Sequence, residues 1–204
     1  MSDARGRILE RVRGALATRT PLDHPGHFAG WRPEAPSPDP ALGFAALFTR
    51  SGGEVERAPS IEEARRWIQD FAADFDGIAV GSSLPAGLTP DGSVVSPDLA
   101  ALGVSMARAA VAETGSLVLD ARDGRRTQLL PPTHLVVLRR SDVFGTLAEA
   151  LERLSADLTS ALGLHSGPSK SADIGQILVK GVHGPGRVVT LLVDDADTPS
   201  TPLP

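Results

Sequence analysis

Three short segments of the sequence place acid–base, hydroxyl or ammonium groups beside glycine in tight turns. The first is 112–116, where Glu113 lies in a Thr-Gly turn between two apolar segments. Partial desolvation raises the pKa of a carboxyl group toward the range useful for proton transfer or nucleophilic attack. Glu113 is therefore a candidate catalytic residue. The alternative is a turn residue that binds neighbouring amides.

The second segment, 166–174, predicts an anion site. Gly167 and nearby serines lead into a region that we expect to be helical, and the start of a helix presents free N–H groups to an anion. Lys170 adds a positive charge, and Ser169 or Ser171 would cap the helix. We expect a carboxylate or phosphate to bind here, with an ordinary capped helix start as the alternative.

The third segment, 180–186, surrounds His183 with three glycines and a proline. This composition predicts a rigid, exposed loop, and an exposed histidine exchanges protons near neutral pH. His183 is therefore a candidate for proton transfer, with a structural role as the alternative. Ligands of open α/β sheets bind outside the carboxyl ends of the strands, and we expect all three segments at that edge.

The elements that position these segments alternate between strand-like and helical patterns. Strands are predicted near 55 and 164 and over 78–80, 116–119, 134–138 and 187–193, with a short one from 104. Helices are predicted over 4–18, from 40 to about 50, from 61 to about 75, over 142–162 and over 172–179, and a hairpin tip at 123–126. This alternation predicts a mainly parallel sheet with helices on both faces.

The chain is expected to have three parts. Residues 1–40 form a helix followed by a proline-rich arm, residues 41–193 form an α/β domain, and residues 194–204 form a flexible tail. The first residues contain no apolar run of the length that a signal peptide or a membrane span needs. We therefore expect a cytoplasmic protein without a membrane span.

Composition excludes several classes of function. The 204 residues carry a net charge of −5, the wrong sign for a general nucleic-acid binder. There is no cysteine, which excludes disulfides, thiolate zinc sites and any iron–sulfur cluster held by this chain alone. We predict no metal site. Only two of the 20 basic residues are lysines, Lys170 and Lys180.

Four segments, in this order, resemble the lactate-utilization protein C family, the small LUD-domain proteins. They are AETGSLVL at 112–119, LLPPTHLVV at 129–137, SGPSKSADI at 166–174 and VKGVHGP at 179–185. The resemblance is specific from about residue 76 to 193. Ser116 and Ser171 stand where threonine is common in the family, and both keep the hydroxyl group.

The resemblance implies a three-layer α/β/α fold like that of the phosphosugar isomerase and CoA-transferase-like group. It also implies a role in the oxidation of L-lactate to pyruvate with two partner proteins that carry iron–sulfur clusters, while this chain binds no cofactor of its own. The residues expected to contact substrate or anion are Thr114, Gly115, Ser116, Gly167, Pro168, Ser169, Lys170, Ser171, Asp173 and Gly184.

The sequence therefore favours a subunit of an L-lactate-oxidising system. Lactate would bind through its carboxylate behind Ser169 and Lys170, and Glu113 or His183 would take the hydroxyl proton. One alternative is a non-catalytic assembly subunit for the iron–sulfur partners. Another is a CoA-transferase-like enzyme that acts on a different small anionic metabolite, with Glu113 as nucleophile.

Overall fold

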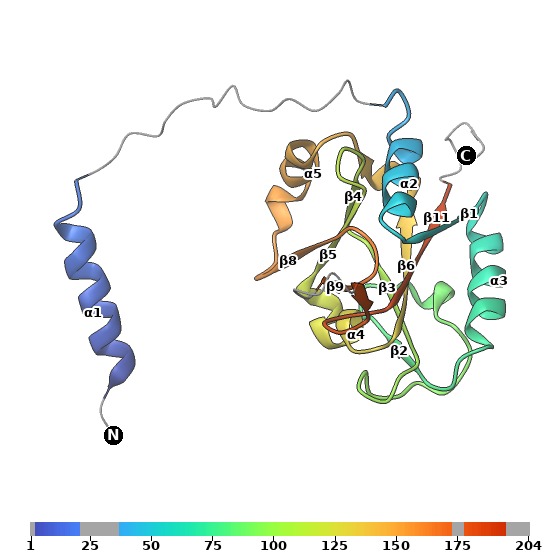
Figure 1. The fold of residues 1–204 in the computed structure, drawn as a ribbon, viewed down its shortest axis with the longest axis horizontal. Coiled ribbons are helices and arrows are strands. Elements are labelled where there is room, and N and C mark those ends of the chain that lie inside the picture. Colours follow the sequence, from blue (N-terminus) through green and yellow to red (C-terminus); the bar gives the residue numbers. More distant parts are fainter. Residues whose placement is uncertain (1–2, 21–36, 173–177, 195–204) are drawn as a thin grey trace. The chain divides into compact units, whose positions relative to one another are not determined.

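The computed structural model describes residues 3–20, 37–172 and 178–194 (Figure 1). The chain divides into two compact units, Met1–Pro33 and Glu34–Pro204. Each unit is described by itself. In the described part of the chain, no helix is both long enough and apolar enough to cross a membrane.

The smaller unit contains the amphipathic helix α1 (Ala4–Ala17), which confirms the helix predicted over 4–18. Asp3 caps it, because its carboxylate accepts the Gly6 N–H at 2.8 Å. The apolar side chains Ile8, Val12 and Leu16 recur every four residues and remain exposed. The apolar stripe of α1 is therefore not packed.

The larger unit is built on a five-stranded sheet in which every neighbouring pair is parallel. Its strands are β1 (Glu54–Ala58), β2 (Ile78–Val80), β3 (Leu102–Met106), β6 (Thr133–Arg139) and β11 (Arg187–Val193), in the spatial order β1-β11-β6-β3-β2. Every residue of the central strand β6 before Arg139 is buried, as expected for a strand covered on both faces. The predicted α/β architecture with a mainly parallel sheet is thus confirmed.

Helices cover both faces of this sheet. The α-helices of the larger unit are α2 (Pro40–Arg50), α3 (Ile61–Ala72), α4 (Arg125–Leu129) and α5 (Leu147–Leu154). Successive residues of β6 belong to different cores: Val137 shares one with Ile68 of α3, and Val136 shares another with Phe44 of α2. Since successive strand residues such as Val136 and Val137 point to opposite faces, α2 and α3 lie on opposite sides of the sheet.

A second sheet, which the sequence did not predict, packs beside the first. It contains β4 (Ala109–Val111), β5 (Ser116–Asp120), β7 (Val143–Phe144) and β8 (Leu162–His165), in the order β7-β4-β5-β8. Every residue of β5 is buried, which confirms the buried strand predicted over 116–119. However, β5 pairs antiparallel with both neighbours, so it does not belong to the parallel sheet.

The long helix predicted over 142–162 is wrong at both ends. A capping box formed by Thr146 and Glu149 starts α5 at Leu147, and α5 ends at Leu154. The leucine spacing continues beyond that point, but 162–165 pair with β5 instead. Cross-strand pairing therefore outweighs a helical period that the sequence alone cannot distinguish from it.

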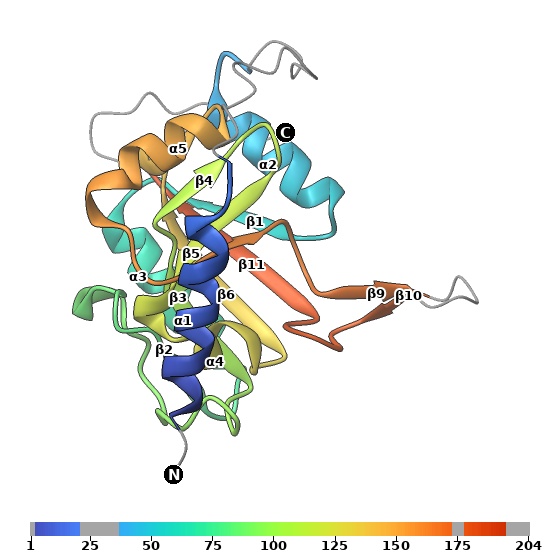
Figure 2. The same ribbon diagram turned by 90° about the vertical axis from the view of Figure 1, so that its left-hand side faces the viewer.

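Two smaller predictions also fail. Residues 123–126 are not a hairpin tip: the short helix Ala121–Asp123 ends there and α4 begins at Arg125. The ends of the helix predicted over 172–179 belong instead to the antiparallel pair β9 (Lys170–Ala172) and β10 (Leu178–Lys180), and residues 173–177 lie outside the described residues. Figure 2 shows this strand pair projecting from the larger unit.

Candidate functional site

Glu113 lies in the turn between β4 and β5, and its carboxylate is bound to the start of a helix. Its Oε1 accepts the N–H of Leu147, the first residue of α5, at 2.7 Å. The Glu113 N–H donates to the Gly145 carbonyl at 3.0 Å. First-turn N–H groups have no acceptor within their own helix, so this carboxylate stabilises α5. The geometry is that of a turn residue that binds neighbouring amides.

Ser116 connects the first segment to the second. Its buried hydroxyl oxygen lies 2.8 Å from Thr114 Oγ1 and 2.6 Å from Ser166 Oγ. The antiparallel pairing of β5 with β8 produces this contact, because Leu117 is directly opposite His165. Two segments that are distant in the sequence are therefore joined by hydroxyl hydrogen bonds.

The helix start that was expected to hold an anion is not found in the described part of the second segment, while anion binding by its residues stays a prediction. Residues 170–172 form β9, and Lys170 is directly opposite Lys180 of β10. The Lys170 ammonium donates to the carbonyl of Ser51, which follows the last residue of α2. Predicted site residue Asp173 lies outside the described residues.

The third segment lies at the amino end of the parallel sheet. The N–H groups of Gly186 and Arg187 donate to the carbonyl of Pro132, just before β6, at 3.0 and 3.2 Å. The expectation that this segment lies at the carboxyl edge is therefore wrong, because its loop precedes β11 instead of following a strand. The loop contacts the second segment: the Ser169 N–H donates to the Pro185 carbonyl at 2.8 Å.

Backbone N–H groups of the third segment also bind Ser169 of the second segment. The His183 N–H donates to Ser169 Oγ at 3.3 Å, and the Gly181 N–H donates to the Ser169 carbonyl at 3.0 Å. The His183 side chain is exposed. A Cβ on Gly184 would lie 3.5 Å from the Ser169 Cβ, so the loop passes close to that serine.

Both glycine turns approach the end of α2. Gly115 has φ +59°, and a Cβ there would lie 2.6 Å from the Leu47 Cβ. Gly167 has φ +107°, and a Cβ there would lie 3.0 Å from the Ser51 carbonyl oxygen. We call the residues gathered here the motif cluster: Thr114, Gly115, Ser116, Ser166, Gly167, Pro168, Ser169, Lys170, Ser171, His183 and Gly184.

His165 is the residue at this site that the sequence analysis missed. It is the last residue of β8, directly before Ser166, and burial lowers its pKa. His134, at the amino end of β6, is fully buried behind it, and burial together with the nearby His165 lowers the pKa of His134 to about 3. The position of His165 immediately before the Ser-Gly-Pro-Ser motif was the available signal.

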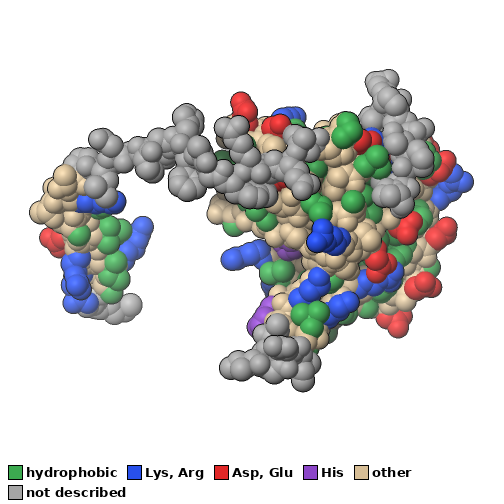
Figure 3. Space-filling view, turned by 45° about the horizontal axis from the view of Figure 1, so that its top comes forward, with side chains coloured by type: hydrophobic (Ala, Val, Ile, Leu, Met, Phe, Trp, Pro, Cys, Tyr) green, Lys and Arg blue, Asp and Glu red, His purple; other side chains and the backbone are tan. Residues whose placement is uncertain are grey.

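The motif cluster offers hydroxyl groups, an ammonium group and an exposed imidazole. Hydroxyl groups donate hydrogen bonds to oxyanions, and the imidazole of His183 can take or give a proton. Among residues 3–20, 37–172 and 178–194, no three or more His, Asp or Glu side chains lie close enough together to hold a metal ion. In Figure 3 most visible acidic side chains lie toward the right edge of the larger unit, and the histidines lie away from it.

A family model matches the part of the chain that contains the four motif segments. The family model described as LUD domain matches residues 96–193. Lactate utilization protein C 1 of Bacillus mycoides is 36% identical over 102 residues, which cover 46% of this chain and 44% of that protein. The chain thus spans less than half of this relative. Lactate utilization protein C of Deinococcus radiodurans is 31% identical over 190 residues, which cover 81% of this chain and 89% of that protein.

A solved structure has the same fold. The crystal structure of a DUF162 family protein from Deinococcus radiodurans superposes with a TM-score of 0.56 at 20% identity, covering 76% of this chain and 96% of that one. The LUD-domain match and the relative aligned over most of both lengths together establish the relationship. The chain belongs to the lactate utilization protein C family of LUD-domain proteins.

Proposed function

We propose that this chain acts in lactate utilization, as a cytoplasmic subunit of a system that oxidises L-lactate to pyruvate with two iron–sulfur proteins. The names of its relatives support the substrate. The chain has no cysteine, so thiolate-held iron–sulfur clusters have to be supplied by other chains. The division of labour is that the partners carry the electrons and this chain contacts the substrate.

The observation that carries this proposal is the convergence of the motif cluster. Ser116 belongs to the first segment and Ser166 to the second, and their hydroxyl groups are hydrogen-bonded. Ser169 of the second segment accepts the N–H of His183 from the third, and Lys170 follows Ser169 in the chain. Hydroxyl and ammonium groups bind a carboxylate, and an exposed imidazole at the edge of such a site suits a 2-hydroxy acid. The site lies on the amino side of β11.

Oxidation of L-lactate to pyruvate removes two electrons and two protons. In this proposal His183 accepts the hydroxyl proton, and the partner proteins would have to take up the hydrogen on C2 together with the two electrons. Glu113 is not assigned this role, because its carboxylate accepts the Leu147 N–H. The same contact argues against Glu113 as the nucleophile of a CoA-transferase-like reaction.

The test is lactate-dependent dye reduction by the three proteins reconstituted without oxygen. Omission of this chain should abolish the activity. His183→Gln should lower the rate at least about tenfold while size-exclusion profiles show unchanged assembly. Glu113→Gln and the matched exposed-loop variant Lys180→Gln should stay near the wild-type rate. Full activity in His183→Gln would contradict proton transfer at this residue.

Non-catalytic assembly is the second candidate, and exposed apolar side chains favour it. Leu130 and Val182 are 49% and 54% exposed, and Leu129 lies against Gly184 of the motif cluster. Clustered apolar side chains on a surface mark interaction sites. On this alternative, Val182→Ser abolishes co-purification with the partners, whereas His183→Gln leaves both assembly and dye reduction unchanged.

A further inference from the structure

A cavity lies at the carboxyl edge of the parallel sheet, the edge opposite to the motif cluster. Its volume is about 370 Å³. Its wall includes Ser60, Ile61, Met106, Val137, Arg139 and Asp194. None of the described residues that the sequence predicted for the functional site lines this cavity. The carboxyl edge is where open α/β sheets bind ligands, so the cavity occupies a position that the proposed function leaves unused.

Strand register explains why these side chains meet. Met106 pairs with Val137, and Val193 pairs with Arg139 on the next strand. Val137 and Arg139 are two residues apart on β6, so they point to the same face of the sheet. Ile68 of α3 belongs to the core on that face, which places the cavity between the sheet and the start of α3.

Two features make the wall attractive to a negative charge. Arg139 is exposed, and no ion pair or hydrogen bond joins its side chain to any described residue. At the start of α3, Ser60 accepts the Glu63 N–H at 3.2 Å. The first-turn amides of Ile61 and Glu62 have no acceptor within the helix, and both residues line the cavity.

Asp194 also lines the cavity, and arginine side chains neutralise its carboxylate. Its side chain is 5% exposed, and its Oδ2 lies 2.6 Å from Arg57. Its Oδ1 is buried without a hydrogen-bond partner in the described part of the chain, with Arg140 Nη1 at 3.8 Å. Arg140 Nη1 is also buried without a hydrogen-bond partner in the described part of the chain, so Asp194 and Arg140 form a long ion pair and Asp194 is not assigned a contact with a ligand. Arg140 also pairs with Asp39, which balances the charges of this group.

We propose that this cavity binds a small organic anion. Its carboxylate or phosphate binds Arg139 and the amides of Ile61 and Glu62, and its apolar body packs against Met106 and Val137. The site is separate from the motif cluster, so this inference goes beyond the proposed function and does not depend on it.

The test uses the full isotope-labelled chain and three aromatic probes. Phenyl phosphate and 4-hydroxyphenylacetate provide the two oxyanions, and 4-methylphenol provides a ring and a donor without an anion. Both anions, or one of them, should shift the amide resonances of Ile61 and Glu62 in a saturable manner, and the neutral probe should not. The better anion identifies the chemical class. Equal binding of 4-methylphenol, or saturable shifts confined to the motif cluster, would overturn the proposal.

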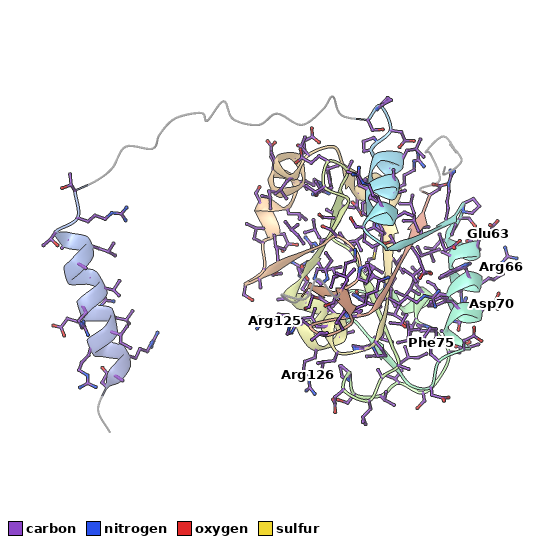
Figure 4. The ribbon with its side chains drawn as sticks, viewed as in Figure 1. Glu63, Arg66, Asp70, Phe75, Arg125 and Arg126 are labelled. Carbon is purple, nitrogen blue, oxygen red and sulfur yellow. The ribbon has the colours of Figure 1, made fainter. Side chains whose placement is uncertain are left out.

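A matched pair of variants distinguishes a specific anion site at Arg139 from a general attraction of anions to surface arginines. Arg139 and Arg125 are both exposed, and neither side chain forms an ion pair with a described residue. Figure 4 labels Arg125 on α4, away from Glu63 and Asp70, which it labels on α3. Arg139→Gln should raise the Kd of the bound anion about tenfold, and Arg125→Gln less than about twofold. Equal effects of the two substitutions would refute a site at Arg139.

Discussion

The Ser105 hydroxyl lies 2.7 Å from Nε2 of His134, and neither side chain is exposed to solvent. The two residues come from the neighbouring parallel strands β3 and β6. Nδ1 of His134 is also buried, and no described residue forms a hydrogen bond with it. The imidazole is therefore held neutral, because a proton on it would place an uncompensated charge in the core.

This burial predicts a loss of stability in acid. The pKa of His134 is about 3 in the folded protein and 6.5 for an ordinary histidine. Above the ordinary value both states are neutral and nothing changes with pH. Below it the unfolded chain gains the proton first, so the free energy of unfolding falls by up to about 1.4 kcal/mol per pH unit, or about 2 kcal/mol by pH 5.

Urea unfolding at about pH 7.5 and about pH 5 measures this effect. His134→Gln should show a smaller pH dependence than wild type, although its stability at neutral pH falls as well. His183→Gln, which removes an exposed imidazole, should keep the wild-type dependence. The lower pH stays near 5 because Glu54, whose pKa is lowered by its hydrogen bond to Arg187, loses stabilisation further down. Parallel pH profiles for wild type and His134→Gln would contradict the prediction.

Gly115→Ala should be far more damaging than Gly124→Ala. Both glycines have positive φ, +59° and +72°, which costs a residue with a side chain about 1–2 kcal/mol. A Cβ at Gly115 would also lie 2.7 Å from the Phe48 backbone nitrogen, whereas one at Gly124 meets nothing within 4 Å. We expect losses of about 3 kcal/mol or more against about 1 kcal/mol, measured by urea unfolding. Equal losses would mean that the close contact between Gly115 and α2 contributes nothing beyond the cost of the positive φ.

Local signals predicted the elements whose ends are set locally. Asp39 before Pro40 marks the start of α2, because its side chain accepts the Ala41 N–H at 3.0 Å. The last strand was predicted with the bounds that the structure gives, 187–193. The failure at 142–162 arises because residues 162–165 pair with β5, which is distant in the sequence. At 172–179 the partner is local, but the periodicity of a short apolar run does not distinguish a strand from a helix.

In the candidate site, too, the sequence predicted the local motifs but not the features that depend on strand pairing. The sequence identified the motifs around Ser116, Ser169 and His183, and the structure brings these motifs together. The order of the strands decides which edge of the sheet these motifs occupy, and the local sequence does not contain that order. The contact of Glu113 with Leu147 depends on the tertiary arrangement in the same way. His165 escaped notice because its burial depends on the pairing of β8 with β5.

Glu113 should prove to be a structural residue, so its substitution should lower the free energy of unfolding measurably. Glu113→Gln keeps an acceptor for the Leu147 N–H and loses only the charge at the start of α5, so we expect a loss of about 0.5 kcal/mol. Glu113→Ala also removes the hydrogen bond and should cost about 1–2 kcal/mol. Urea unfolding separates the two. A Gln variant as unstable as the Ala variant would show that the charge, not the hydrogen bond, stabilises the helix.

The last prediction concerns the buried ion pairs at the carboxyl edge. The Arg140 side chain is 7% exposed and pairs with Asp39, which caps α2, while Asp194 lies 3.8 Å away. Removal of the guanidinium leaves the Asp39 carboxylate without its partner and Asp194 with Arg57 alone. Arg140→Met should therefore cost about 3–5 kcal/mol.

An exposed pair provides the matched control. Arg126 lies 2.7 Å from Asp98, and their side chains are 67% and 50% exposed, so solvent screens the interaction. Arg126→Met should cost at most about 1 kcal/mol, and this small loss should vanish in concentrated salt. The loss in Arg140→Met should persist in salt, because water and ions do not reach the buried charges. If the two variants lose equal stability and respond equally to salt, the buried group does not hold the start of α2 to the ends of β6 and β11.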